Sequence, residues 1–386
     1  MTAALYTLTS DLHSVGSDVS LEPFVIGVRE ALGCDLMVRG TDWSDFGTHD
    51  ADLIYVRTGG TEGLFLDLVR KGLVRKESHI LLLTSGKQNS LAASMEILTW
   101  LHREGWSGEI LHGSAEMIAD KIKNGPADTC TVQYEPVPEE FRMALCGKRA
   151  GIIGRPSDWL ISSDVDPDNA RRRLGLELVD VPMQELLDEV FTHKCDLRGF
   201  EGSEAVYESL KVIVDRYRLD GITLRCFDLL DTVHNTGCLA LARLNAEGIP
   251  SSCEGDVPAL ITMMAAQEMT GCPGFQCNLS RVEGRECLFA HCTVPLSMVS
   301  SFRYDTHFES GIGTAIKGEI PEGPVSIMRI APDLEKMVCL PGRILRNQGE
   351  PGLCRTQIVV DTDPAYFLTA PLGNHHIITP SYSPKK

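Results

Sequence analysis

The chain has 386 residues, of which 43% are hydrophobic and 23% charged, proportions typical of a soluble globular protein with two or three domains. Its net charge of −17 argues against nonspecific binding to nucleic acid or anionic membranes, because Lys and Arg are not in excess. No apolar run is long enough to span a bilayer, and residues 1–6 lack signal-peptide features, so we expect a cytoplasmic protein.

Strand-like and helix-like segments alternate through the first part of the chain. Strands are predicted at 52–57 and 79–84, each followed by a glycine-containing turn, and an amphipathic helix is predicted at about 91–102. The order of strand, glycine turn and helix is typical of a parallel sheet. We therefore predict a Rossmann-like α/β domain over residues 1–145.

A segment rich in Pro and Glu, residues 128–140, is interpreted as a linker to a second Rossmann-like domain over residues 146–296. The elements predicted in this second domain are strands at 149–154, 176–179, 221–225 and 288–290 and helices at 203–217, 239–247 and 258–269. After residue 296 helical patterns largely vanish, and β-prone segments at 324–330 and 355–361 are separated by Gly and Pro. This change predicts a small β-rich domain over residues 297–386.

The 13 cysteines are odd in number and irregularly spaced, and no two of them form a CxxC motif. In a long cytoplasmic chain this pattern favours buried free thiols. A zinc or iron–sulfur site with cysteine ligands would need a regular spacing that the sequence lacks.

The residues with the clearest chemistry lie in two short motifs far apart in the chain. One contains Glu254 and Asp256, the other contains His375 and His376, and His291 lies between them. Carboxylates and imidazoles are ligands for a divalent metal such as Mn²⁺, and carboxylates also move protons. Ligands spread over more than a hundred residues must be brought together by a large fold, as in an enzyme cleft.

Seven short segments together resemble the L-fucose isomerase and L-arabinose isomerase superfamily, in particular its shorter fucose isomerase-like members. The segments are TGGTE at 58–62, NSLAA at 89–93, PSDWL at 156–160, LRCFD at 224–228, CEGD at 253–256, AHCT at 290–293 and GNHH at 373–376. Each segment alone has little specificity, but the series follows the family's order along nearly the whole chain.

The resemblance implies two α/β domains followed by a β-rich domain, and an enzyme that interconverts an aldose and a ketose through an enediol at C1 and C2. In such enzymes a Mn²⁺-type ion holds two substrate oxygens, and two acidic groups move the proton. The family also builds its clefts at subunit contacts. The expected partners are therefore a small sugar and further copies of the chain, in a trimer or hexamer, with no nucleic acid or membrane.

The resemblance also implies roles for individual residues. Glu254 matches a glutamate that serves as both metal ligand and acid–base group. His375 matches the C-terminal metal-ligand histidine, with His376 as the alternative at this place. His291 matches a histidine that the arabinose enzymes use as a ligand and the fucose enzymes do not.

One position departs from the family pattern. The second acidic ligand is expected about two dozen residues after Glu254, where this chain has Asn278. An amide oxygen can coordinate a metal but cannot act as a base. Either another carboxylate, such as Asp256, Asp305 or Glu309, transfers the proton, or the protein does not catalyse the standard isomerisation. In the first case we expect Asp256 to be the catalytic partner of Glu254.

Substrate-binding residues are expected at strand ends, where open parallel sheets place ligands. Ser157, Asp158 and Trp159 follow a predicted strand, and the Trp159 ring either stacks on a sugar or packs in the core. His307 either reaches the substrate or belongs to a plain connecting loop, and His376 is the remaining substrate-binding candidate.

Arg225 also follows a predicted strand. It could bind a substrate phosphate, sulfonate or carboxylate, or it could form a structural ion pair with Asp228 or Asp256. Three functions remain open: a metal-dependent sugar isomerase, another enediolate-forming enzyme such as a lyase or transferase on the same scaffold, and a noncatalytic sugar-binding protein.

Overall fold

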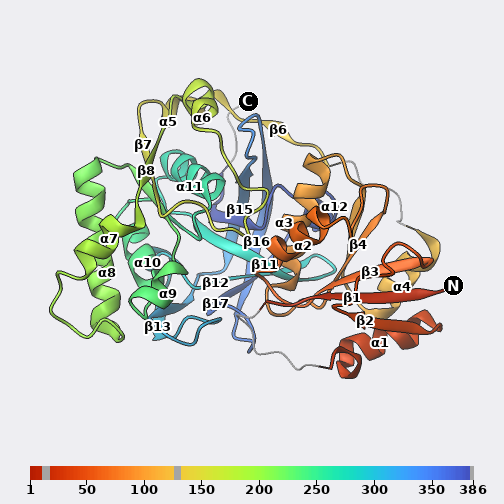
Figure 1. Ribbon diagram of the computed structural model, residues 1–386. Helices are drawn as coiled ribbons and strands as arrows, with labels where there is room; N and C mark the ends of the chain where they lie inside the picture. Colours follow the sequence, from red (N-terminus) through yellow and green to blue (C-terminus); the bar gives the residue numbers. More distant parts are fainter. Residues whose placement is uncertain (11–17, 126–131, 383–386) are drawn as a thin grey trace. The chain divides into compact units, whose positions relative to one another are not determined.

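The computed structural model describes residues 1–10, 18–125 and 132–382 (Figure 1). The chain divides into two compact units. Unit 1 comprises residues 1–133, 279–287 and 363–374, and unit 2 comprises residues 134–278, 288–362 and 375–386. None of the helices in the described residues is long and apolar enough to cross a membrane.

Unit 1 is built on a five-stranded parallel sheet with the strand order β2-β1-β3-β4-β5. The strands are β1 (Ala3–Leu8), β2 (Leu36–Gly40), β3 (Ala51–Val56), β4 (Ile80–Thr84) and β5 (Gly108–Leu111). The helices are η1 (Val19–Leu21), α1 (Pro23–Leu32), α2 (Glu62–Arg70), α3 (Ser90–Arg103), α4 (Ala115–Asn124) and α12 (Ala365–Thr369). All six residues of β1 are buried, as expected for a parallel strand covered on both faces. The predicted strands at 52–57 and 79–84 and the predicted helix at 91–102 are confirmed as β3, β4 and α3.

Unit 2 contains a second parallel sheet, with the order β10-β9-β7-β8. Its strands are β7 (Arg149–Ile153), β8 (Glu177–Val181), β9 (Gly221–Leu224) and β10 (Ser251–Cys253). The helices of this unit are α5 (Glu139–Leu145), α6 (Pro167–Leu174), α7 (Met183–Val190), α8 (Phe200–Tyr217), α9 (Asp228–Thr232), α10 (Cys238–Ala246) and α11 (Val257–Thr270), with α7 and α8 side by side (Figure 1). The elements predicted for this region are confirmed to within a few residues.

The segment 128–140, interpreted as a linker, contains the boundary between the two compact units at residues 133 and 134, but it is not entirely without regular structure. Residues 128–131 lie outside the described residues, but β6 (Glu135–Pro136) and the start of α5 fall within the rest. The reason is packing, since Phe141 and Leu145 of α5 are fully buried in the core of unit 2. The prolines of this segment precede the helix and so do not interrupt it.

The β-rich part is an antiparallel barrel-like sheet with the order β15-β18-β11-β12-β17-β16, in which β15 also pairs with β16 and closes the ring. Its strands are β11 (Phe275–Glu283), β12 (Glu286–His291), β15 (Gly323–Ile330), β16 (Lys336–Gln348), β17 (Thr356–Asp361) and β18 (His375–Pro380), with β6 added beside β16. A separate ribbon is formed by β13 (Ser301–Asp305) and β14 (Ala315–Glu319), and η2 (Leu296–Met298) precedes it. Because β11 and β12 precede residue 296, the β-rich part is not only the C-terminal segment, and a count of three domains is not confirmed.

Helix α11 holds the two sheets of unit 2 together. Residues 257–266 are all buried, and the helix contacts β7, β9 and β10 of the parallel sheet as well as β15 and β18 of the barrel. A helix whose whole surface is apolar must be buried by other elements on every side. The ends of β10 and β18 are therefore brought into one region of unit 2. The cysteines among the described residues are free thiols, as predicted, but not all are buried, since Cys146 is exposed and Cys34, Cys195, Cys272 and Cys339 are only partly buried.

Candidate metal centre

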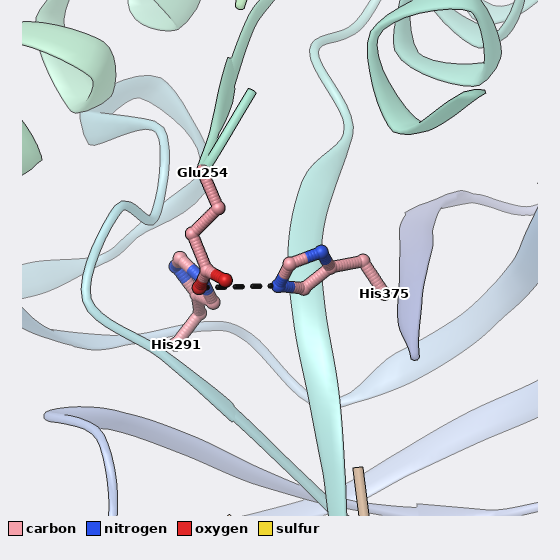
Figure 2. A group of neighbouring side chains, drawn as sticks. All are labelled: Glu254, His291 and His375. Atoms are coloured by element: carbon pink, nitrogen blue, oxygen red, sulfur yellow. Dashed lines mark ion pairs between the residues drawn. The ribbon is translucent and has the colours of Figure 1, made fainter. Parts of the chain in front are cut away.

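Three side chains of unit 2 converge on one point: Glu254, His291 and His375. One potential ligand atom from each lies within 4.8 Å of the others. The Nε2 atoms of His375 and His291 lie 3.4 Å and 3.8 Å from Oε1 of Glu254. Figure 2 shows the carboxylate between the two imidazoles. One carboxylate and two imidazoles are a donor set that suits Mn²⁺ and similar divalent ions, so the residues fit the predicted metal.

Glu254 is presented by a tight turn at the carboxyl end of β10. Its φ angle is 65°, in the left-handed region that non-glycine residues rarely adopt, and Gly255 follows with φ 72°. A Cβ atom on Gly255 would lie 2.6 Å from the carbonyl oxygen of Arg155, so only glycine fits there. The Ser157 N–H donates to the Glu254 carbonyl at 3.1 Å. Left-handed residues of this kind cluster at functional sites, where the surroundings hold them in place.

The two histidines come from the barrel, where His291 ends β12 and His375 begins β18. The Nδ1 atom of His291 lies 2.8 Å from Oγ1 of Thr293, and Nδ1 of His375 lies 2.9 Å from Oδ2 of Asp256. Each ring thus makes an outer hydrogen bond through Nδ1 and directs Nε2 towards Glu254. Metal-bound histidines are generally oriented by such outer hydrogen bonds.

Asp256 lies behind His375 in a fully buried ion pair. Nη1 of Arg329 lies 3.0 Å and 2.9 Å from its two oxygens, and Oδ1 also accepts the Ala259 N–H at the start of α11. Nη2 of Arg329 donates to Oγ of Ser163 at 2.9 Å. Arg329, Asp256 and His375 are all 0% exposed. This position supports a positioning role for Asp256 and not the predicted catalytic one, because substrate cannot reach its oxygens.

The pKa values follow from this arrangement of charges. Burial would raise the pKa of Glu254, but the charge of His375 and hydrogen bonds from both histidines hold it well below its usual range. Burial would likewise raise the pKa of Asp256, and the Arg329 charge lowers it. Burial would lower the pKa of His375, but Glu254 and Asp256 raise it to about 10. The pocket therefore stabilises a positive charge, which a divalent cation would also supply.

Asn278 lies beside this group. It is paired with His375 in the β11–β18 register, and directly opposite residues of an antiparallel pair project to the same face. Its side chain is only 4% exposed, and its Oδ1 atom has no hydrogen-bond partner. A buried acceptor without a donor is costly unless something binds it. This orphaned oxygen fits the predicted role of Asn278 as a further ligand.

An aromatic series extends from the carboxylate. Nε1 of Trp159 donates to Oε2 of Glu254 at 2.7 Å. The Trp159 ring packs edge-on against Phe227 with centroids 4.8 Å apart, and Phe227 packs edge-on against His307 at 5.6 Å. The structure therefore brings Trp159 and His307, two of the predicted substrate-binding residues, into one series with Glu254. Ser157 joins them through its N–H, and its Oγ is buried without a partner.

Each of the three guanidinium nitrogens of Arg225 donates at least one hydrogen bond. Nε bonds Asp228 at 2.9 Å, Nη2 bonds Asp158 at 2.8 Å, and Nη1 donates to the carbonyl of Pro156 at 2.6 Å. These contacts support the structural ion pair with Asp228 that the sequence left open, and they exclude the alternative partner Asp256. Asp158 is occupied by the same arginine.

His376 is placed away from the metal group. Successive residues of a strand project to opposite faces, so His376 projects away from the face that carries His375 and Asn278. It is fully buried there, opposite Cys277. The geometry thus supports His375 over His376 as the ligand and gives His376 no access to a substrate at this site.

Sequence reasoning missed Arg329, Thr293 and Phe227. Arg329 had a usable signal, because it is the only charged residue in the apolar strand β15, and a buried charge in a strand needs an ionised partner. Phe227 and Thr293 carry no local pattern that distinguishes them from core residues.

No protein-family profile matches this chain. Over 231 residues it is 21% identical to the sulfoquinovose isomerases of Priestia aryabhattai and Priestia megaterium. The match covers 52% of this chain and 52% of each relative, so the chain spans about half the length of the curated relatives it matches. The chain is thus similar, over half of its length, to two proteins named as isomerases of a sugar.

Proposed function

We propose that this protein is a divalent-metal-dependent aldose–ketose isomerase that acts on a sugar or modified sugar through an enediol. The observation that carries the proposal is the convergence of Glu254, His291 and His375, with each imidazole oriented by an outer hydrogen bond. The similarity to sulfoquinovose isomerases supports the same reaction class. The resemblance to the L-fucose and L-arabinose isomerase superfamily is consistent with it.

In this proposal Oε1 of Glu254 and the Nε2 atoms of His291 and His375 hold the ion, and Asn278 adds an amide oxygen. The ion is Mn²⁺ or another divalent metal, and when bound it polarises the sugar carbonyl. Open coordination positions are left for substrate oxygens, because only three or four protein ligands are available.

The chain's own residues prepare the site for this reaction. Asp256 fixes the His375 ring, and the Trp159 N–H fixes the rotation of the Glu254 carboxylate so that Oε1 faces the imidazoles. The lowered pKa of Glu254 keeps its carboxylate ionised at neutral pH and therefore available as a metal ligand. Trp159 and Phe227 are in contact beside Glu254, and the face of an aromatic ring there would suit the C–H groups of a sugar.

A second function is favoured by one observation, the amide at Asn278 in place of a carboxylate. If no other base is present, the protein would use an enediolate in a different reaction. It would then be a lyase or a transferase. A noncatalytic sugar-binding protein is the remaining alternative. Measuring the turnover of an aldose distinguishes the isomerase from the lyase or transferase and from the noncatalytic sugar-binding protein.

We also propose that the protein is a homo-oligomer, a trimer or hexamer, with sites completed by a neighbouring chain, as the family resemblance implies. Sedimentation at micromolar concentration should then give a mass well above the 42.3 kDa of one chain. A fully active monomer would contradict this part of the proposal.

The function is tested with the full chain incubated with Mn²⁺ and freed of excess metal. Elemental analysis should show close to one ion per chain, and NMR should show conversion of an aldose to its ketose. Sulfoquinovose is the first aldose to test, followed by a panel of unsubstituted aldoses. Deuterium exchange at C2 without a ketose product would favour the lyase or transferase. Metal binding without exchange would favour the sugar-binding protein.

A further inference from the structure

The amide at Asn278 leaves open which group moves the carbon-bound proton during isomerisation. The sequence left three carboxylates for this role: Asp256, Asp305 and Glu309. The structure places each of them in a different part of unit 2.

Asp256 and Asp305 are both unsuited. The oxygens of Asp256 are fully buried and occupied by Arg329, His375 and the Ala259 N–H. Asp305 ends the solvent-exposed strand β13, where it accepts the Thr306 N–H at 2.8 Å and pairs with Arg355 at 3.5 Å. Neither carboxylate is available to a substrate beside Glu254.

Glu309 lies in a compact loop that is held closed by its own backbone. The His307 N–H donates to the Ile312 carbonyl at 3.0 Å, and the Gly311 N–H donates back to the His307 carbonyl at 2.9 Å. Phe308, between His307 and Glu309, packs into a buried cluster with Cys292 and Cys354. A loop anchored on both sides in this way presents Glu309 in a defined position.

Ring contacts connect this loop to the metal group. The His307 ring contacts Phe227, Phe227 contacts Trp159, and Trp159 donates to Glu254. The Glu309 side chain is 12% exposed, and its Oε2 lies 4.0 Å from Nε2 of His307. Glu309 is therefore a nearly buried carboxylate that is connected to Glu254 through the side chains of His307, Phe227 and Trp159.

The packing of Phe308 places the loop near the metal group. The buried cluster that Phe308 contacts includes Ala290 and Cys292, the two residues on either side of His291. The loop therefore lies beside the end of β12 that carries this proposed ligand.

We propose that Glu309 is the catalytic residue that carries the proton between C2 and C1 of the sugar. The C2–H bond breaks and its proton passes to the Glu309 carboxylate, while the electron pair forms the C1=C2 bond and the C1=O π electrons move to O1. Glu309 then returns the proton to C1 as C2=O2 forms. The proton that O2 loses is the one that O1 gains, so the sugar is only isomerised. This inference rests on the proposed function.

The test compares wild type with Glu309→Gln, which keeps the size and removes the base. Glu322→Gln, the same change at an exposed position, is the matched control. For each protein we would measure Mn²⁺ content, deuterium exchange at C2 of sulfoquinovose, and the rate of ketose formation. We expect Glu309→Gln to retain stoichiometric metal and lose ~10²–10⁴-fold in kcat for both exchange and ketose formation. Glu322→Gln should match wild type.

A readout without turnover is the crystal structure of the Mn²⁺ protein with the polyol made by reducing sulfoquinovose at C1. The Glu309 carboxylate should lie within about 2.6–3.2 Å of the polyol's O1 or O2, or be bridged to one of them by a single water. Wild-type exchange rates in Glu309→Gln, or a Glu309 carboxylate that points away from the polyol, would overturn this inference. Neither result would affect the proposed function. A wild-type protein that binds no Mn²⁺ and exchanges no proton would overturn the proposed function, and this inference with it.

Discussion

Oδ2 of Asp256 lies 2.9 Å from Nδ1 of His375, and both side chains are completely buried. Because the Asp256 carboxylate is ionised, it can only accept, and Nδ1 therefore carries a proton. In the neutral ring this leaves the Nε2 lone pair facing Glu254. On its other side Asp256 pairs with Arg329. The orientation of His375, a proposed metal ligand, therefore depends on a buried ion pair.

The first prediction concerns this pairing. Asp256→Asn removes the charge that faces Arg329 and weakens the hydrogen bond to His375. We expect Mn²⁺ affinity to fall about 10–100-fold, as for other outer partners of metal ligands. The free energy of unfolding should fall by about 3–5 kcal/mol, because Arg329 would remain buried without its partner. Metal titration under native conditions and urea denaturation measure the two effects, with the exposed Asp215→Asn as control.

The second prediction concerns the ligands themselves. Glu254→Ala, His291→Ala and His375→Ala should each weaken Mn²⁺ binding by more than the ~100-fold expected for an outer partner, because each removes a donor atom. Elemental analysis after gel filtration measures the retained metal. His79→Ala, a surface histidine of unit 1, should keep the wild-type content. Wild-type metal content in a Glu254→Ala, His375→Ala double variant would contradict the site.

The third prediction concerns Asn278, which the sequence predicted to limit or redirect the chemistry. Asn278→Asp should tighten Mn²⁺ binding, because it replaces an orphaned amide oxygen with a charged one. If Glu309 moves the carbon-bound proton, aldose turnover should not rise in this variant, and the Glu309→Gln variant should gain activity when Asn278→Asp is added. The rates of proton exchange at C2, measured side by side for the wild type, the single variants and the double variant, distinguish these outcomes. A ~10²-fold gain in the single variant would show that the amide limits the reaction and that Glu309 is not the base.

The fourth prediction concerns pH and His112 in unit 1. Nδ1 of this buried ring lies 2.6 Å from Oγ1 of Thr84, and Nε2 accepts the Val282 N–H at 3.0 Å, so the neutral form is satisfied. Burial lowers the pKa of His112 to about 4. In the unfolded chain its pKa returns to about 6.5. Between these values the unfolded state binds a proton that the folded state does not, so stability is full above pH 6.5 and falls as the pH drops towards 4.

Between pH 6.5 and 4 the free energy of unfolding should fall by up to roughly 1.4 kcal/mol per pH unit. Urea denaturation of wild type and His112→Gln at several pH values measures it, because carboxylate titration is common to both proteins and cancels in the difference. The His112→Gln curve should be flatter between pH 6.5 and 4. Parallel curves for the two proteins would show that His112 does not titrate in this way.

Several elements of both parallel sheets could be predicted from the sequence, because local periodicity reports which segments are buried. The strands β1, β2, β5 and β10 were not predicted. The strands β3, β4, β7 and β9 and the helices α3 and α11 all show the expected pattern within a few residues. The motif around Glu254 was also singled out from the sequence, because its carboxylates are potential metal ligands and acid–base groups. His291 and His375 were named as ligands from the family resemblance, without any indication of how they would meet.

The pairings between distant residues were decided only by the tertiary structure. The sequence does not show that β15 closes onto β16, or that Arg329 meets Asp256 across 73 positions of the chain. The tertiary contacts place Asp256 between His375 and Arg329, pair Arg225 with Asp158 and Asp228, and place His376 on the opposite face of β18. The physical reason is that periodicity records whether a side chain is buried, whereas the role of a buried charge depends on which partner neutralises it.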